Sequence, residues 1–253
     1  MKKERVELLL LISVIAISIF GLVMIYSASY VWAEYKFSDP FKFVKNQGIF
    51  FFVGLGLMFI VSKINYRKYF DNANIFLIGC IVLLILVLIP GIGTVRNGSR
   101  SWFGIGSFGI QPSEFTKLAL IIFTSKYLVN NETKMKNIKK GVFPILGLTL
   151  LIFGIIMLQP DFGTGMVIVM SLIGIIFISG VDLSIFYKIG FLGIIGIVIL
   201  VMIAPYRLAR ILSFLNPWSD PLGSGFQIIQ SLFALSPGGI LGKGINSSIQ
   251  KHY

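Results

Sequence analysis

Cysteine, histidine and charged residues are scarce in this chain. Cys80 is the only cysteine and His252 the only histidine among 253 residues. One chain can therefore form neither a disulfide framework nor a metal centre built from several cysteines or histidines. Charged residues make up 13% of the chain, about half the share of a soluble domain. With 56% hydrophobic residues and a mean hydropathy of +0.89, this composition indicates a membrane protein.

A nucleotide-binding motif is also missing. The glycines at 104, 106 and 109 match G-x-G-x-x-G, but no strand–helix–strand pattern surrounds them, which excludes a dinucleotide site. Acidic residues number 10 against 22 lysines and arginines, giving a net charge of +12. In a chain this apolar, that charge favours anionic lipid headgroups or a phosphorylated lipid over nucleic acid as a partner.

Long apolar runs, in contrast, are abundant, and they predict an all-α polytopic membrane protein. A span needs about 20 mostly apolar residues. The first run, Leu8–Ile25, is longer than the core of a signal peptide, so we expect a retained helix. The predicted spans are residues 8–27, 46–63, 72–90, 111–129, 141–159, 162–180 and 185–204.

Lysine and arginine are denser in the segments that would lie inside if the N-terminus is cytoplasmic, most clearly in "NNETKMKNIKK". Basic loops face the cytoplasm, so we predict a cytoplasmic N-terminus. Residues 1–204 then form a seven-span membrane domain. Residues 205–253 begin a large outer loop with interfacial helices at 205–217 and 226–236.

Two predicted spans begin alike, with Gln111-Pro112-Ser113-Glu114 and with Gln159-Pro160-Asp161. Proline and acidic residues suit a first helical turn, so good helix starts are one interpretation. The other is an outward-facing polar cavity, because ionisable groups at membrane depth usually face a cavity or a partner. Glu114 and Lys117 are three residues apart and can pair on one face.

The predicted outer loops carry further candidates, each with a bland alternative. Arg96 and Arg100 can hold phosphates bidentately, with Trp102 at the interface, or can be solvated in a flexible loop. The stretch with Trp218 and Asp220 also reads as a well-formed turn. The predicted cavity and substrate-binding residues are Arg96, Arg100, Trp102, Gln111, Ser113, Glu114, Lys117, Gln159, Asp161, Arg207, Arg210 and Asp220.

Five segments in this order resemble the SEDS family of bacterial cell-wall proteins, the FtsW/RodA/SpoVE group. They are "GLVMIYSAS", "NGSRSWFGIGSFGIQPSEFTKLA", "QPDFGTG", "APYRLARILSFLNPWSDPLGSGFQIIQS" and "GGILGKGINSSIQKHY". The resemblance covers essentially the whole chain. The stretch "NPWSDPLGSGFQIIQS" resembles the FtsW and SpoVE branches more than RodA.

The resemblance implies a peptidoglycan glycosyltransferase that polymerises lipid II at the outer face of the bacterial plasma membrane. It also implies a class B penicillin-binding transpeptidase and other division or sporulation proteins as partners, at the septum. Such chemistry needs a general base near the acceptor hydroxyl and positive charge at the leaving pyrophosphate. No cofactor is identified, and a divalent cation held by pyrophosphate and a carboxylate stays open.

Members of the family have about ten spans, whereas seven are predicted here. The resemblance places the catalytic aspartate beyond Tyr253, so we expect a fragment or a truncated product and name no catalytic residue. Two other functions stay open: a lipid II transporter and a non-catalytic scaffold of the division or sporulation machinery.

Overall fold

The structure is a computed structural model that describes residues 2–96, 98–104, 108–136, 138–203, 205–239, 242–248 and 250. Gly106 and His252, both considered in the sequence, lie outside the described residues. The chain divides into a terminal unit, Met1–Lys63 with Gly196–Tyr253, and a central unit, Ile64–Ile195. The predicted division at residue 204, between membrane domain and outer loop, stays a prediction.

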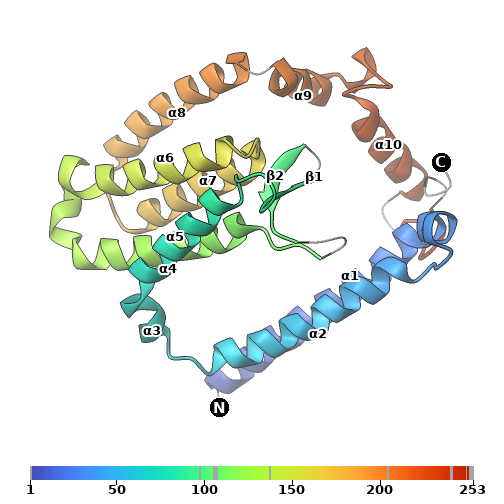
Figure 1. The fold of residues 1–253 in the computed structure, drawn as a ribbon, viewed down its shortest axis with the longest axis horizontal. Helices are drawn as coiled ribbons and strands as arrows, with labels where there is room; N and C mark the ends of the chain where they lie inside the picture. The colour runs from blue at the N-terminus through green and yellow to red at the C-terminus, as the bar shows by residue number, and fades with distance from the viewer. Residues whose placement is uncertain are drawn as a thin grey trace. The chain divides into compact units, whose positions relative to one another are not determined.

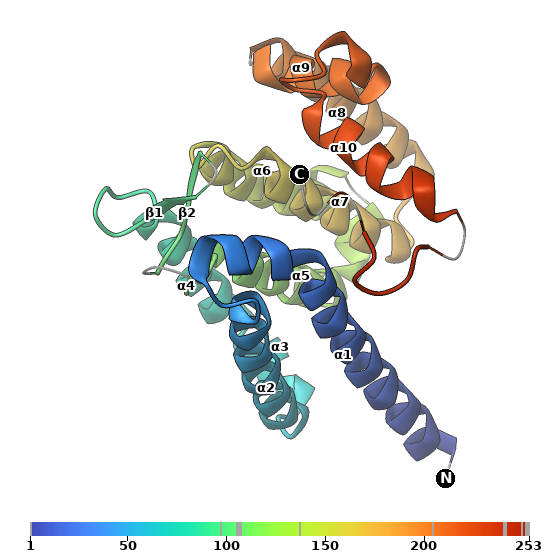
Figure 2. The same ribbon diagram turned by 90° about the vertical axis from the view of Figure 1, so that its right-hand side faces the viewer.

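Helices make up most of both units (Figures 1 and 2). The α-helices are α1 (Lys2–Phe37), α2 (Lys42–Ser62), α3 (Tyr66–Asp71), α4 (Ala73–Leu86), α5 (Pro112–Asn130), α6 (Phe143–Met157), α7 (Phe162–Ile178), α8 (Leu183–Ile203), α9 (Pro205–Leu215) and α10 (Phe226–Leu235). Short helical turns of other types are η1 (Glu132–Lys136), the π-helix η2 (Ile138–Val142), η3 (Pro217–Ser219) and η4 (Ser236–Gly238). Strands β1 (Thr94–Arg96) and β2 (Ser99–Trp102) form an antiparallel hairpin, which departs from the all-α prediction.

A helix lies over each of the seven predicted spans. Four are long and apolar enough to cross a membrane, namely Glu7–Phe37, Lys42–Ser62, Lys139–Met157 and Leu183–Ile203. The apolar helices α4 and α7 have 14 and 17 residues, or roughly 21 and 26 Å, less than the hydrocarbon core of about 30 Å. Helix α5 carries Glu114, Lys117 and Lys126 within 19 residues.

The span predicted at 72–90 is therefore shorter as a helix. Beyond Leu86 the chain tightens, because the N–H groups of Leu88 and Ile89 bond to carbonyls three residues earlier. Such turns often end an α-helix. Apolar composition located this segment correctly, but composition does not register where the backbone leaves the helical path.

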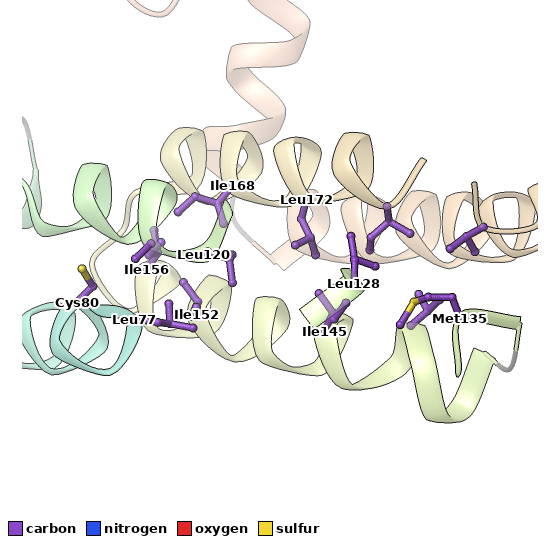
Figure 3. Packing of buried hydrophobic residues seen from close by; sticks show 14 of the residues in the cluster. Leu77, Cys80, Leu120, Leu128, Met135, Ile145, Ile152, Ile156, Ile168 and Leu172 are labelled. Carbon is purple, nitrogen blue, oxygen red and sulfur yellow. The ribbon is translucent and has the colours of Figure 1, made fainter. Parts of the chain in front are cut away.

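The core of the central unit lies among α4, α5, α6 and α7, where Leu84, Leu120, Ile152 and Leu172 are at most 1% exposed. Figure 3 shows Cys80 and Ile156 toward one end of this cluster and Met135 and Ile145 toward the other. The single cysteine is thus buried among apolar side chains and acts as a small hydrophobic residue.

The terminal unit is packed differently. Helices α1 and α2 lie side by side (Figures 1 and 2), yet no described residue of α2 is buried. Large apolar side chains such as Ile17 and Phe52 are 71% exposed. Surfaces this apolar are stable against lipid rather than water. The predicted interfacial segments form α9 and α10, and Leu208, Ile211 and Leu212 are exposed on α9.

Candidate functional site

The β1–β2 hairpin, the start of α5 and the turn between α6 and α7 meet at one end of the central unit (Figure 1). Arg96 pairs with Ser99 and Val95 with Arg100 across the hairpin. A second backbone contact, between Phe103 and Ile110, returns the chain to the start of α5. Six of the predicted site residues lie in or next to these three segments, and three more follow on the first turns of α5. The six are Arg96, Arg100, Trp102, Gln111, Gln159 and Asp161, and the three are Ser113, Glu114 and Lys117.

The two similar helix starts contact each other through Asp161. Gln111 donates its side-chain N–H to Asp161 Oδ2 at 2.8 Å. Asp161 is also the N-cap of α7: it accepts the backbone N–H of Thr164 at 3.2 Å and the Thr164 hydroxyl at 2.8 Å. Capping satisfies an N–H that the helix leaves unpaired. Asp161 thus forms a good helix start, as the first interpretation predicts, and it also links α7 to α5. The polar cavity of the second interpretation stays a prediction.

The prolines of the two starts are placed differently. Pro112 lies in the first turn of α5, as expected. Pro160 precedes the N-cap Asp161 and so lies outside α7. The difference arises because the Asp161 side chain, rather than the proline, defines where α7 begins.

Gln159 is completely buried and holds three segments together. Its side-chain N–H donates to the Leu84 carbonyl of α4 at 3.1 Å, and its own carbonyl accepts the Ser99 hydroxyl of β2. Among the described residues, Gln159 Oε1 and the buried Ser113 hydroxyl have no hydrogen-bond partner. Gln159 therefore helps to position the hairpin, and its assignment to a cavity or substrate-binding site stays a prediction.

The two hairpin arginines have different surroundings. Arg96 donates to the Phe108 carbonyl at 3.0 Å, and its guanidinium lies 5.0 Å from the Trp102 ring centroid. The stacked pair joins two predicted site residues in one cation–π contact. Arg100 has one hydrogen bond within the described part of the chain, at 3.5 Å to Leu88 O. Since guanidinium has five N–H donors, Arg100 retains donors for a ligand.

Glu114 and Lys117 form the predicted pair on α5, with Lys117 Nζ 2.9 Å from Glu114 Oε2. The Glu114 side chain is 54% exposed and that of Lys117 28%. An exposed pair of this kind contributes little to stability, on the order of 0–1 kcal/mol.

Arg207, Arg210 and Asp220 belong to the terminal unit and are described separately from the hairpin. Arg207 donates to the Leu200 carbonyl at 2.7 Å, and both arginines stack on the Tyr206 ring at 5.4 and 5.9 Å. Their positive charges therefore lie on one side of α9 around a single tyrosine.

Asp220 closes the turn that was the alternative interpretation of this stretch in the sequence analysis. Its carboxylate accepts the backbone N–H groups of Gly223 and Ser224 and the Ser224 hydroxyl. The Ser224 backbone bond, followed by its side-chain bond, lowers the pKa of the Asp220 carboxyl. At Gly225 a Cβ would lie 2.0 Å from the Pro217 carbonyl oxygen, so the turn requires glycine there.

We expect the stability of this turn to depend on pH. The fluorescence of Trp218 can report the change, because the Trp218 ring packs against Phe233 with 6.0 Å between ring centroids. The folded pKa of Asp220 lies below the unfolded one. Its carboxylate therefore stabilises the turn fully above about pH 4, and this contribution is lost as pH falls through the folded pKa. In a Trp32→Phe/Trp102→Phe background, Trp218 fluorescence should be constant from pH 7 to about 4 and change below. Asp220→Asn should remove that transition, and a transition retained in the variant would contradict the assignment.

The sequence did not single out Ser99 and Thr164. Thr164 had a local signal, since it follows Asp161 at the spacing of a capping interaction. Ser99 had none, because its partner Gln159 is 60 positions away. For a metal, no group of three or more His, Cys, Asp or Glu side chains is found within the described ranges.

Comparison with known proteins gives concordant results. The chain is 49% identical, over 252 residues, to "Stage V sporulation protein E" of Bacillus subtilis, covering all of this chain and 69% of that protein. It is 39% identical to "Probable peptidoglycan glycosyltransferase FtsW" of Geobacter sulfurreducens, covering 99% of this chain and 67% of the relative. It thus spans about two thirds of the length of these relatives.

A solved structure described as "Structural coordination of polymerization and crosslinking by a peptidoglycan synthase complex" is also similar. The TM-score is 0.63 at 30% sequence identity, covering 86% of this chain and 63% of the matched one. The sequence profile of the FtsW/RodA/SpoVE group, described as "Cell cycle protein", matches residues 7–253. The resemblance identified in the sequence is confirmed, and the chain belongs to the FtsW/RodA/SpoVE family of cell cycle proteins.

Proposed function

We propose that the protein is a peptidoglycan glycosyltransferase that polymerises lipid II at the outer face of the plasma membrane. The observation that carries the proposal is the similarity, over 99% or more of the chain, to relatives with sporulation and glycosyltransferase names. In this reaction an acceptor sugar hydroxyl attacks the anomeric carbon of the growing chain, and the polyprenyl pyrophosphate leaves. The residues described here supply binding and positioning, and we assign no general base among them.

Seven helices cross the membrane in this proposal, with the N-terminus in the cytoplasm and the hairpin outside. The support is the packing of α4, α5 and α7 in one core with the apolar helix Lys139–Met157, which is long enough to cross a membrane, together with the lysines of the α5–α6 connection at the opposite end from the hairpin (Figure 1). A Lys134→Cys variant in a Cys80→Ser background should react with an impermeant maleimide only after the membrane is opened. Labelling of sealed cells would reverse the orientation.

The hairpin end suits the pyrophosphate of such a substrate. Arg100 has donors left for phosphate oxygens, and the buried Gln159 fixes the strand that carries it. Positive charge placed where a leaving pyrophosphate accumulates negative charge stabilises the transition state. We also propose a class B penicillin-binding transpeptidase as partner and the division or sporulation septum as location, by analogy with the synthase complex and the relatives.

Incubation of the native protein, purified from its own membranes, with fluorescent lipid II tests the proposal, with the intact mass measured on the same sample. Glycan polymer is the expected product. Movement of lipid II across vesicles without polymer would assign a transporter instead. If the protein neither polymerises lipid II nor moves it across vesicles, the remaining function is that of a non-catalytic scaffold.

Arg100→Ala should lower kcat/KM for lipid II about 10- to 100-fold, the effect of losing a charge-assisted hydrogen bond of about 1.5–3 kcal/mol to the leaving pyrophosphate. Its thermal unfolding should change little, because the bond to Leu88 is long. Arg100→Lys should be intermediate, since lysine keeps the charge but loses the bidentate geometry. An unchanged rate at limiting lipid II in Arg100→Ala would exclude the phosphate role.

A further inference from the structure

The end of the central unit opposite the hairpin carries a cluster of exposed cations. We call it the basic platform: Lys134, Lys139 and Lys140 in the η1–η2 segment, with Arg67 and Lys68 on α3. All five residues are exposed. Three acidic residues, Asp71, Glu132 and Asp182, lie at the same end, so the cations outnumber them.

The platform is a packed structure rather than a loose loop. Met135 and Val142 are 8% and 0% exposed and belong to the core cluster. The Tyr127 hydroxyl of α5 donates to the Lys140 carbonyl at 3.2 Å. A Cβ at Gly141 would lie 2.5 Å from the Lys134 carbonyl oxygen, so η1 and η2 approach each other as only glycine permits. The lysines are therefore presented from a defined backbone.

Helix α3 packs against α5 at the end of the central unit that carries the basic platform. Lys126 of α5 donates to the Asp71 carbonyl at 2.9 Å, and its ammonium lies 5.5 Å from the Phe70 ring centroid. Tyr69 and Phe70 of α3 are partly buried, whereas its basic residues Arg67 and Lys68 are exposed and face outward.

The depth of these cations favours a lipid over a soluble partner. Lys139 and Lys140 form the first turn of the apolar helix Lys139–Met157, which is long enough to cross the membrane. Phe143, three residues further, is 68% exposed and would face acyl chains. A lysine in the first turn of a membrane-crossing helix lies at headgroup level, where each one contributes about 1 kcal/mol of attraction to anionic lipid.

We infer that the basic platform binds the headgroups of anionic phospholipids in the leaflet it faces. The proposed orientation identifies this leaflet as the cytoplasmic one, and the inference depends on that orientation. It does not depend on polymerase activity. The 3-10 helix η1 carries Lys134, and the π-helix η2 carries Lys139 and Lys140. The close approach of Gly141 to Lys134 brings the two turns together, which concentrates positive charge where lipid phosphodiester groups lie. π-Helical turns are rare and often mark functional positions.

The test compares native protein in nanodiscs of phosphatidylcholine with and without phosphatidylglycerol. Spin-labelled phosphatidylglycerol should be immobilised in preference to spin-labelled phosphatidylcholine, and salt should weaken the preference. Lys134→Gln/Lys139→Gln/Lys140→Gln should lower the preference at least about fivefold. The matched Lys134→Arg/Lys139→Arg/Lys140→Arg variant keeps charge and should keep the preference.

Equal immobilisation of both lipids by the native protein, or an unchanged preference in the glutamine variant, would overturn the inference. Binding of soluble polyglutamate with the same dependence on the three lysines, without lipid preference, would assign the platform to an acidic protein. Because the readout needs no lipid II, its failure is distinguishable from failure of the proposed polymerase activity.

Discussion

Gln159→Glu is expected to lower the stability of the protein by several kcal/mol, the effect of placing an incompletely paired charge in the interior. Gln159 is 0% exposed, and its side-chain N–H donates to the Leu84 carbonyl. Glutamate has the same shape but loses this donor, so a carboxylate oxygen would face a carbonyl oxygen. Thermal unfolding in nanodiscs should show a large fall in Tm, and the variant should accumulate poorly in cells.

Two further variants separate charge from hydrogen bonding. Gln159→Leu also loses the bond to Leu84, but it removes the unpartnered Oε1, so its destabilisation should be smaller, on the order of 1–3 kcal/mol. Gln227→Glu is the matched control, because Gln227 is exposed near the start of α10 and should change stability by no more than about 0.5 kcal/mol. A Gln159→Glu protein as stable as this control would contradict the burial of Gln159.

Asp161→Ala is expected to reduce the rate of lipid II polymerisation about 100-fold, because small displacements of positioned groups have effects of that size. The change removes the N-cap of α7 and the bond from Gln111 of α5. Loss of the cap alone should destabilise the protein by about 1 kcal/mol, so most molecules should remain folded. The measurement is single-turnover polymerisation alongside thermal unfolding.

Conservative and matched variants make this result interpretable. Asp161→Asn keeps an oxygen for the Thr164 N–H, so its rate should fall less than that of Asp161→Ala. Asp182 accepts the Ser184 N–H at 2.8 Å at the start of α8, so Asp182→Ala removes a comparable local bond away from the hairpin. Its rate should stay near that of the native protein. Equal losses in the two alanine variants would mean that general destabilisation, rather than the link between α5 and α7, causes the effect.

Local pattern located most of the secondary structure, including a helix over every predicted span and the amphipathic α9. It also predicted the Glu114–Lys117 pair, since residues three apart on a helix are neighbours regardless of the fold. The hairpin at 94–102 was missed as structure because its short strands lie in a glycine-rich segment without an alternating apolar pattern. The length of α4 was overestimated because the residues after Leu86 stay apolar while the backbone changes to turns with hydrogen bonds three residues apart.

The amino-acid sequence by itself determined that this is a helical membrane protein of the FtsW/RodA/SpoVE family. The length of the apolar segments, the basic loops and the long motifs can all be recognised from residues that are neighbours in the sequence. Tertiary structure alone decided the roles of two similar glutamines. Gln111 reaches Asp161, 50 positions away, whereas Gln159 turns inward to Leu84, 75 positions away. Both bonds follow from how α4, α5 and α7 pack. The buried amide of Gln159 bonds to the backbone carbonyl that α4 presents, and the part-buried amide of Gln111 bonds to the carboxylate that caps α7.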